Sequence, residues 1–383
     1  MRRRFLFNKK RVLLIYDYFE PAVLAGGPIV SCTNLVKYLH NEYDFYIYTS
    51  NQDMDKSVLP VKPDQWLTYH NIAKVFYGDV KWSIKGYCEL LKKLRPDVIY
   101  INGVYSFIGV MVPLILTRLL IKKTKIIIAP RGMLQTRALT VKRLKKKCYL
   151  TVFRRLVEMN SVSWHVTGEQ EKNDLNNFLG IDHCAKIKLV GNIPSTNQVF
   201  VQRVNNTQVL KLLMIALVSP MKNILNVIKA LQRMTGKVVY TLYGTIKEKD
   251  YWERCLTQID LLSPSITVVY GGIAARDDIP SILASHDIYI QPSKSENFSH
   301  SIYEALMSGM PVITSHNTPW RVKDAGAGWN VDGEMPQNIA QALFEAAALG
   351  EGRYRAMSEQ ARRLGEEYLL QADLKTGYSQ LFG

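Results

Sequence analysis

The chain has 383 residues, 47% of them hydrophobic, and a formal net charge of +16 at pH 7. This composition excludes a disordered chain, and the length suits two domains of ordinary size rather than one. The five cysteines are scattered and form no Cys-x-x-Cys pair, which favours a reduced, cytosolic compartment over a disulfide-stabilised secreted protein.

All of the excess positive charge lies in the first half of the chain. Residues 1–200 contain 31 Lys and Arg against 15 Asp and Glu, whereas residues 201–383 contain 18 of each. A uniformly soluble protein has no need of such an asymmetry. It therefore predicts a polyanionic partner for the N-terminal half, and nucleic acid, an anionic membrane and a phosphorylated acceptor all fit.

The N-terminal half alternates short apolar runs with stretches long enough for a helix, which indicates parallel strands joined by helical crossovers. The N-terminus is basic but lacks the apolar core and cleavage site of a signal peptide, so VLLIY is read as a buried first strand. The strands predicted here are 12–16, 45–49, 98–101, 125–129, 163–167 and 186–190.

The longest apolar stretch covers 107–117, continues past Arg118 and contains Pro113. It falls short of the roughly 20 residues that a membrane-spanning helix needs. Two interpretations stay open, a buried crossover helix and a segment that dips into a membrane.

The pattern breaks at GNIPS, 191–195, and restarts after a polar stretch at 202–208. Strands are predicted at 211–217, 238–243, 266–270, 288–291 and 311–314, with helices at 223–234, 279–284 and 301–308. We therefore expect two doubly wound α/β domains, 1–200 and 201–365, with a C-terminal helix of about 366–383 as a candidate to pack back on the first. Ligands of such sheets bind at the carboxyl ends of the strands, so a cleft between the domains is expected to hold the site.

Two glutamates stand eight positions apart where the strand at 288–291 gives way to a helix. Glu296 lies in a polar loop and Glu304 lies two turns into the helix, which Ser299 or Ser301 could cap. The start of a helix offers free N–H groups and a positive dipole end to a phosphate, and carboxylates accept hydrogen bonds from sugar hydroxyls. A capped surface helix without a ligand is the alternative.

Several motifs follow one another along the chain. They are AGGPIVS (25–31), IAPRGML (128–134), WHVTGEQE (164–171), SPMKN (219–223) and PSKSENFSHSIYEALMSGMPVITSHNTPW (292–320). By their order and spacing, the sequence resembles the family 4 glycosyltransferases of the GT-B fold, including their EX7E motif. The resemblance runs from about Val12 to Trp329.

The resemblance implies a role for individual residues in binding a nucleotide-sugar. Glu304 should bind the ribose hydroxyls, Glu296 the hexose hydroxyls, and Lys222 the diphosphate leaving group. Glycines should allow close approach of the backbone to the donor. The remaining donor-binding residues implied are Gly26, Gly27, Gly244, Gly272, Asn297, Phe298, Ser299, His300 and Ser301.

The chain also departs from the family pattern. Many relatives have an arginine five positions before the lysine, where this chain has Leu217, and a histidine near the loop that here holds Arg131. Arg131 is therefore a third candidate catalytic residue beside Glu296 and Lys222; the alternative is a salt-bridged loop arginine. Asp53-Met54-Asp55 spells a DxD sequence, but the family is typically metal-independent, so we expect no metal and no cofactor. His165 is interpreted as a structured residue rather than a proton carrier.

A basic run opens a predicted helix that extends to about Glu158. It is either a solvated face or an interfacial helix that faces anionic lipid, and the resemblance favours the second. The residues of this predicted membrane and acceptor surface are Lys142, Arg143, Lys145, Lys146 and Lys147.

The leading hypothesis is therefore a retaining glycosyltransferase (a hexosyltransferase of class EC 2.4) that acts at the cytoplasmic face of the cell membrane. It would move a hexose or N-acetylhexosamine from a nucleotide-sugar, most simply UDP-linked, to a polyprenyl-diphosphate-linked glycan in the synthesis of O-antigen, capsule or exopolysaccharide. One alternative is a nucleotide-sugar epimerase or hydrolase of the same fold. Another is a nucleic-acid-binding protein, although no aromatic residues interleave with the basic run as a stacking platform requires.

Overall fold

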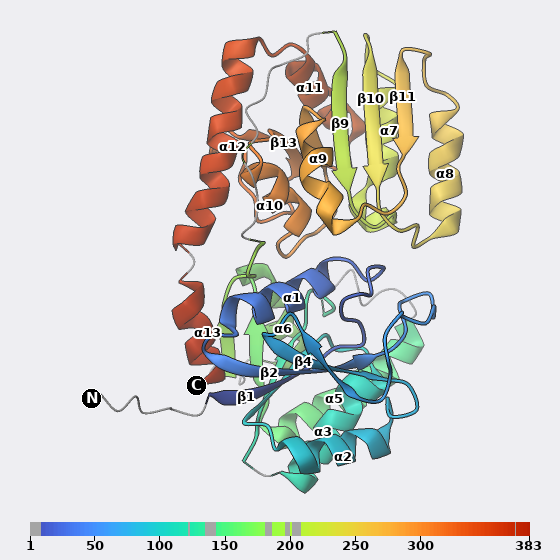
Figure 1. Cartoon of the computed structure of the whole chain (residues 1–383). Helices are drawn as coiled ribbons and strands as arrows, with labels where there is room; N and C mark the ends of the chain where they lie inside the picture. The colour runs from blue at the N-terminus through green and yellow to red at the C-terminus, as the bar shows by residue number, and fades with distance from the viewer. Residues whose placement is uncertain are drawn as a thin grey trace, which may run out of the picture. The chain divides into compact units, whose positions relative to one another are not determined.

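The computed structural model describes residues 9–121, 123–134, 143–180, 186–195, 200, 208–371 and 373–383. The chain forms two compact units, each built around one sheet (Figure 1). The first unit comprises Met1–Ile193 and Asp373–Gly383, and the second comprises Pro194–Ala372. The sequence had indicated boundaries near 200 and 365.

The first unit contains an eight-stranded sheet with the order β3-β4-β2-β1-β5-β6-β7-β8. Neighbouring strands are parallel except for the antiparallel pair of β3 and β4. The strands are β1 (Lys10–Ile15), β2 (Tyr43–Ser50), β3 (Trp66–Tyr69), β4 (Ala73–Gly78), β5 (Val98–Asn102), β6 (Lys125–Ala129), β7 (Ser163–Val166) and β8 (Ile187–Leu189).

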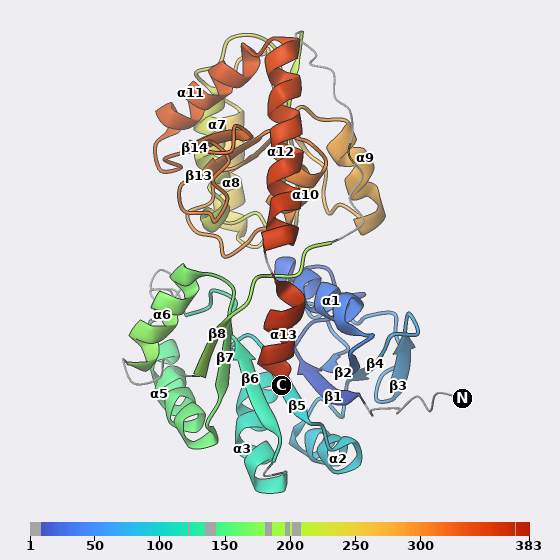
Figure 2. The ribbon, with the colours of Figure 1, turned by 90° about the vertical axis from the view of Figure 1, so that its left-hand side faces the viewer.

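Helices cover both faces of this sheet, with α2, α3 and α5 on one side and α1 and α13 on the other (Figure 1). Figure 2 shows α13 lying along the sheet, where the ring of Phe382 contacts those of Tyr43 and Tyr100. The helical elements are α1 (Gly27–Leu39), α2 (Ile84–Leu94), the π-helical turn η1 (Phe107–Met111), α3 (Val112–Leu120), α5 (Arg143–Asn160), α6 (Glu169–Leu179) and α13 (Leu374–Phe382).

The second unit contains a six-stranded parallel sheet with the order β11-β10-β9-β12-β13-β14. Its strands are β9 (Leu210–Ile215), β10 (Val238–Tyr243), β11 (Ile266–Tyr270), β12 (Ile288–Gln291), β13 (Val312–Ser315) and β14 (Gly328–Val331). Its helical elements are η3 (Pro220–Lys222), α7 (Ile224–Leu231), α8 (Lys249–Ile259), η4 (Arg276–Asp278), α9 (Ile279–Ala284), α10 (His300–Met307), α11 (Pro336–Ala347) and α12 (Glu351–Gln371).

Helices pack on both faces of the second sheet, and its strand β9 is apolar from Leu212 to Ile215. Leu212 and Met214 point into the core formed with α7, α8 and α11, whereas Leu213 points into the core formed with α9 and α10. Side chains alternate between the faces of a strand, so a strand covered on both sides favours apolar residues at successive positions. The prediction of two doubly wound α/β domains is confirmed. The cleft between them stays a prediction.

The apolar stretch at 107–117 forms η1 and the start of α3. Val110, Val112 and Leu114 are buried in the core of the first unit, so the interpretation as a crossover helix is confirmed for this part. Leu119, near the end of α3, is 71% exposed. Among the described residues, no helix is long and apolar enough to cross a membrane.

Candidate functional site

The candidate site of the second unit lies where the strand order of its sheet reverses. β9 and β12 are neighbours, and the chain runs from β9 to β10 on one side and from β12 to β13 on the other. Loops that leave the carboxyl ends of such a strand pair diverge and leave room for a ligand. Lys222 follows β9 at the end of η3, and Glu296 follows β12 in the next loop.

The structure brings together Lys222 and Glu296, two of the predicted site residues. The Nζ atom of Lys222 forms an ion pair with Oε1 of Glu296, and both side chains are largely buried, at 19% and 11% exposed. The same carboxylate oxygen accepts a hydrogen bond of 2.9 Å from Nε2 of Gln291, the last residue of β12. The two loops also meet through their backbones, because the Lys294 N–H donates to the Met221 carbonyl at 2.9 Å.

Gln291 connects this ion pair to the start of α10. Its Nε2 donates to Oγ of Ser299 at 3.0 Å, and its Oε1 accepts from Ser301 at 3.1 Å and from Tyr289 at 2.7 Å. Ser299 has φ of 64°, a conformation that non-glycine residues rarely adopt. Such strain persists where the surrounding contacts determine the backbone, and it concentrates at functional sites. The first N–H groups of α10 have no partners within the helix.

Glu304 lies on α10 with its side chain only 3% exposed. Burial raises the pKa of this carboxyl, and the charge and hydrogen bond of Arg276 act in the opposite direction. Nη2 of Arg276, in the turn η4, lies 2.7 Å from Oε1 of Glu304. Arg276 is 41% exposed, so the pair joins a buried acid to a cation at the surface.

The glycines predicted near the base are adjacent in space. The N–H of Gly244 donates to the carbonyl of Gly272 at 2.7 Å. Gly244 has φ of 143°, and a Cβ there would collide with the carbonyl oxygen of Ala216, so a side chain is excluded at this position. Gly272 has φ of 73° with open space around it. Their contact with a base stays a prediction.

The other residues of the EX7E segment differ in their surroundings. Phe298 is 5% exposed and packs in an aromatic cluster with Trp320 and Tyr368, so its side chain is part of the core. Its backbone carbonyl accepts from the indole N–H of Trp320. The ring of His300 stands edge-on to that of Phe298. Asn297 lies in the loop between Glu296 and Phe298.

Three of the predicted donor-binding and catalytic residues belong to the first unit. Gly26 precedes α1 with φ of 65° and ψ of −130°, which requires glycine, whereas a Cβ on Gly27 would meet nothing within 4 Å. Arg131 donates to Oδ1 of Asn102 and Oδ1 of Asn192, each at 2.7 Å, and to the hydroxyl of Tyr100 at 2.8 Å. These contacts all lie within the first unit, and the catalytic role of Arg131 stays a prediction.

The network around Arg131 also explains His165. Tyr100 lies 2.7 Å from Nδ1 of His165, and Nε2 of His165 lies 2.9 Å from the carbonyl of Val190. Burial, with the charge of Arg131 as the smaller cause, lowers the pKa of His165 to about 3. A neutral ring therefore donates from Nε2 to Val190 and accepts at Nδ1 from Tyr100.

The two aspartates of the DxD sequence accept hydrogen bonds from protein groups, Asp55 within its own loop and Asp53 from the loop that precedes α1. Asp53 accepts from the backbone N–H groups of Val23 and Leu24, and Asp55 accepts from Ser57. Among the described residues, no group of three or more His, Cys, Asp or Glu side chains could hold a metal ion. The absence of a metal from the reaction stays a prediction.

The predicted basic surface is described only in part. Lys142 lies outside the described residues. Arg143, Lys145, Lys146 and Lys147 belong to α5, but their side chains lie outside the described part.

Two residues of this site escaped the sequence analysis. Arg276 lies 28 positions before Glu304 and belongs to no recognised motif, so only the fold shows that they meet. Gln291 ends a predicted strand at its carboxyl end, which is a signal that could have identified it.

No curated protein sequence matches the chain. Many solved structures share its fold, among them three that match over nearly their whole length. A sucrose-phosphate synthase from Thermosynechococcus elongatus is 17% identical, with a TM-score of 0.76 over 98% of this chain and 99% of that chain. HepE from Anabaena, in complex with UDP and glucose, is 15% identical, with a TM-score of 0.71 over 97% and 98%. WaaG, a glycosyltransferase involved in lipopolysaccharide biosynthesis, is 14% identical, with a TM-score of 0.65 over 97% and 98%.

These similarities define the class of the protein, since two Rossmann-like sheets with full-length likeness to such structures make up the GT-B fold. Residues 195–364 match the family described as "Glycosyl transferases group 1". The second unit therefore carries a domain of that family, and the chain is a glycosyltransferase, an enzyme of class EC 2.4.

Proposed function

We propose that the second unit binds a nucleotide-sugar, UDP-linked, and that the enzyme transfers its hexose or N-acetylhexosamine with retention of configuration. The observation that carries this proposal is the Lys222–Glu296 ion pair at the strand reversal of the second sheet. It puts a cation suited to a diphosphate beside an acid suited to sugar hydroxyls. The HepE structures, which contain UDP-glucose or UDP with glucose, support this choice of donor.

Each charged group has a distinct part in this proposal. Transfer of a sugar passes through an oxocarbenium-like transition state, and negative charge collects on the departing diphosphate. The ammonium of Lys222 and the first N–H groups of α10 stabilise that charge. Glu296 accepts hydrogen bonds from the hexose hydroxyls, and Glu304 accepts them from the ribose. A fixed cation and helix N–H groups supply the stabilisation that a metal gives elsewhere, so we propose a metal-independent reaction.

We further propose that the first unit takes a polyprenyl-diphosphate-linked glycan at the cytoplasmic face of the membrane, in the synthesis of a bacterial surface polysaccharide. The excess charge of residues 1–200 supports an anionic surface as partner. In the part of α5 whose side chains are described, Val152 is 51% exposed and Arg155 is also exposed. An apolar residue beside basic ones suits an interfacial helix. WaaG, which acts in lipopolysaccharide biosynthesis, supports the pathway.

The donor site is tested by thermal unfolding with UDP, GDP, ADP, CMP and dTDP. A ligand at a hundredfold excess over Kd stabilises the protein by about 2.7 kcal/mol. We expect a shift with UDP that is absent in Glu304→Gln, which keeps the shape of the side chain and removes its charge. Glu345→Gln is the matched control, because this exposed glutamate on α11 also accepts hydrogen bonds.

The control should keep the shift of the native protein. If none of the five nucleotides shifts the transition, or if Glu304→Gln responds to UDP as the native protein does, the donor site proposed here is wrong. A shift with GDP or ADP alone would correct the nucleotide and keep the site.

A further inference from the structure

Gln291 is a buried polar residue at a position where packing alone favours an apolar one. It ends β12 and is fully buried, whereas the three residues before it, 288–290, are apolar or aromatic and belong to the two cores of the second unit. Burial of an amide costs free energy unless the amide forms hydrogen bonds. The partners of this amide therefore indicate why the chain has glutamine here.

The amide of Gln291 bonds only to side chains in the described structure, one on β12 and four in the loop and helix that follow. Most side-chain hydrogen bonds in proteins go to backbone groups or water instead. An amide with these partners fixes the positions of other side chains. Its own orientation is also determined, because a carboxylate accepts hydrogen bonds and does not donate them, so Nε2 rather than Oε1 faces Glu296.

Glu296 is held by two contacts that differ in permanence. Its Oε1 accepts a hydrogen bond from Gln291 and forms the ion pair with Lys222. The ammonium of Lys222 is a point charge on a flexible stem, and in the reaction proposed above it also binds the diphosphate. The side chain of Gln291 is fixed in turn by the hydroxyls of Tyr289 and Ser301. The bond from Gln291 is therefore the contact that stays unchanged when a donor binds.

The other oxygen of the Glu296 carboxylate is available to a ligand. Lys222 and Gln291 both contact Oε1, and no group in the described part of the chain donates to Oε2. The bond from Gln291 limits the rotation of the carboxylate, so Oε2 keeps one direction. A carboxylate that is fixed before the ligand arrives loses less conformational entropy when it binds a hydroxyl.

We propose that Gln291 is a positioning residue of the donor site, which holds Oε1 of Glu296 so that Oε2 accepts a hydroxyl of the hexose. Gln291 acts on the sugar through Glu296 and makes no contact of its own with the donor. Its loss should therefore weaken the binding of a nucleotide-sugar more than the binding of the nucleotide. This inference depends on the donor site proposed above.

Gln291→Glu tests the contact, because its effect changes with pH. The protonated carboxyl keeps one donor and one acceptor of the amide, whereas the ionised carboxylate repels Glu296. Two carboxylates at this distance share a proton, and the pKa of one of them is strongly raised. We therefore expect the variant to bind UDP-sugars about as tightly as the native protein at pH 5, and about tenfold more weakly than the native protein at pH 8.

Calorimetry on the full-length protein measures these affinities at both pH values, with UDP, UDP-glucose, UDP-galactose and UDP-N-acetylglucosamine as probes. UDP carries more negative charge at pH 8 than a UDP-sugar does. Repulsion by the new charge alone would therefore weaken UDP more, whereas displacement of Glu296 weakens the UDP-sugars more. Gln291→Met brings no charge and has a similar volume, so it should weaken the UDP-sugars about tenfold more than UDP at both pH values.

Gln341→Glu is the matched control. Gln341 also donates to a glutamate, at 3.0 Å to Oε1 of Glu345, but this pair is exposed on α11. The control should bind every probe as the native protein does. Equal losses for UDP and the UDP-sugars in Gln291→Met, or a larger loss for UDP in Gln291→Glu at pH 8, would overturn the positioning role.

The remaining outcomes also decide between the two proposals. If the native protein binds UDP and a UDP-sugar and both variants of Gln291 bind them as tightly, this inference fails and the donor site stands. If both variants lose UDP binding even at pH 5, Gln291 supports the fold of the second unit rather than Glu296, and the positioning role is wrong. If the native protein binds none of the four probes, the proposed function fails and this inference fails with it.

Discussion

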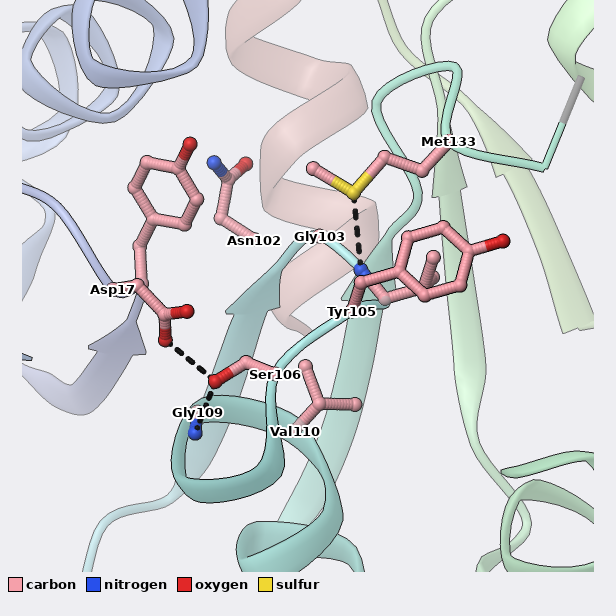
Figure 3. A pocket seen from close by; sticks show the side chains of 10 residues that line it. Asp17, Asn102, Gly103, Tyr105, Ser106, Gly109, Val110 and Met133 are labelled. Carbon is pink, nitrogen blue, oxygen red and sulfur yellow. Dashed lines mark hydrogen bonds between the residues drawn. The ribbon is translucent and has the colours of Figure 1, made fainter. Parts of the chain in front are cut away.

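The raised pKa of Asp17 leads to a prediction about the free energy of unfolding that does not depend on any ligand. Burial raises the pKa of this carboxyl from 3.8 to about 6, and the hydrogen bond from Ser106 (Figure 3) only partly offsets this. Each tenfold change in a protonation equilibrium corresponds to about 1.4 kcal/mol. The charged form of Asp17 therefore costs the folded state about 3 kcal/mol relative to the unfolded state.

The direction of the pH dependence follows from this raised pKa. The unfolded chain releases the proton near pH 3.8 and the folded one near pH 6, so the stability that the protonated acid contributes is present below pH 3.8 and is lost as pH rises through 6. Asp17→Asn is neutral throughout and loses nothing. Between pH 4.5 and pH 8, the free energy of unfolding of the variant should therefore rise by about 2 kcal/mol relative to that of the native protein, which is most of the total of about 3 kcal/mol.

Hydrogen exchange of peptides that cover β1 and β5 measures this difference within the first unit, at several pH values. Asp55→Asn is the control, because Asp55 is fully exposed and hydrogen bonds from Ser57 lower its pKa. The difference in stability between Asp55→Asn and the native protein should have the opposite dependence on pH. A difference between Asp17→Asn and the native protein that stays constant over this pH range would refute the reasoning, as would a variant less stable than the native protein at pH 8.

Three further predictions concern the donor site and the surface. Arg276→Ala removes the cation that opposes the raised pKa of Glu304. The affinity for UDP, measured by calorimetry, should therefore fall by about tenfold at pH 6.5 and recover in part at pH 8.5. A loss of affinity that is the same at both pH values would contradict this reasoning. Replacement of Lys145, Lys146 and Lys147 by serine should weaken binding to anionic vesicles by about 3 kcal/mol, as measured by co-sedimentation, and leave the thermal shift with UDP unchanged. Equal co-sedimentation of the variant and the native protein would show that these lysines do not bind the membrane. EDTA should leave transferase activity intact, whereas a loss reversed by Mg²⁺ or Mn²⁺ would show that a metal takes part.

The sequence predicted several strands closely and missed others. The predicted bounds of β6, β10 and β12 agree with the structure residue for residue, because a buried parallel strand is a continuous apolar run. Those of β11, an edge strand, agree as well. The strands β3, β4 and β14 were missed. β3 lies at the edge of its sheet, where only its last residue, Tyr69, is buried. β14, also at an edge, begins with Gly328 and contains Asn330, both unfavourable in strands.

The candidate site divides in the same way. The sequence predicted Lys222 and Glu296 because both lie in loops next to recognisable strands and within motifs. Arg276 was missed because its partner Glu304 is brought to it only by the packing of η4 against α10. The proximity of Asp17 and Asn102, at the strand reversal between β1 and β5, was missed for a related reason, since each follows or ends a predicted strand but only the order of strands in the sheet makes them neighbours.

The two sheets put different chemistry at the same topological position. At the β9–β12 reversal a lysine is paired with a glutamate. At the β1–β5 reversal a partly desolvated aspartate lies near the amide of Asn102, whose Nδ2 has no partner within the described part of the chain. A departing diphosphate needs a cation, and the β9–β12 reversal supplies one. The charge of Asp17 costs the folded state free energy because burial raises the pKa of this carboxyl, so Asp17→Asn should be the more stable protein at neutral pH.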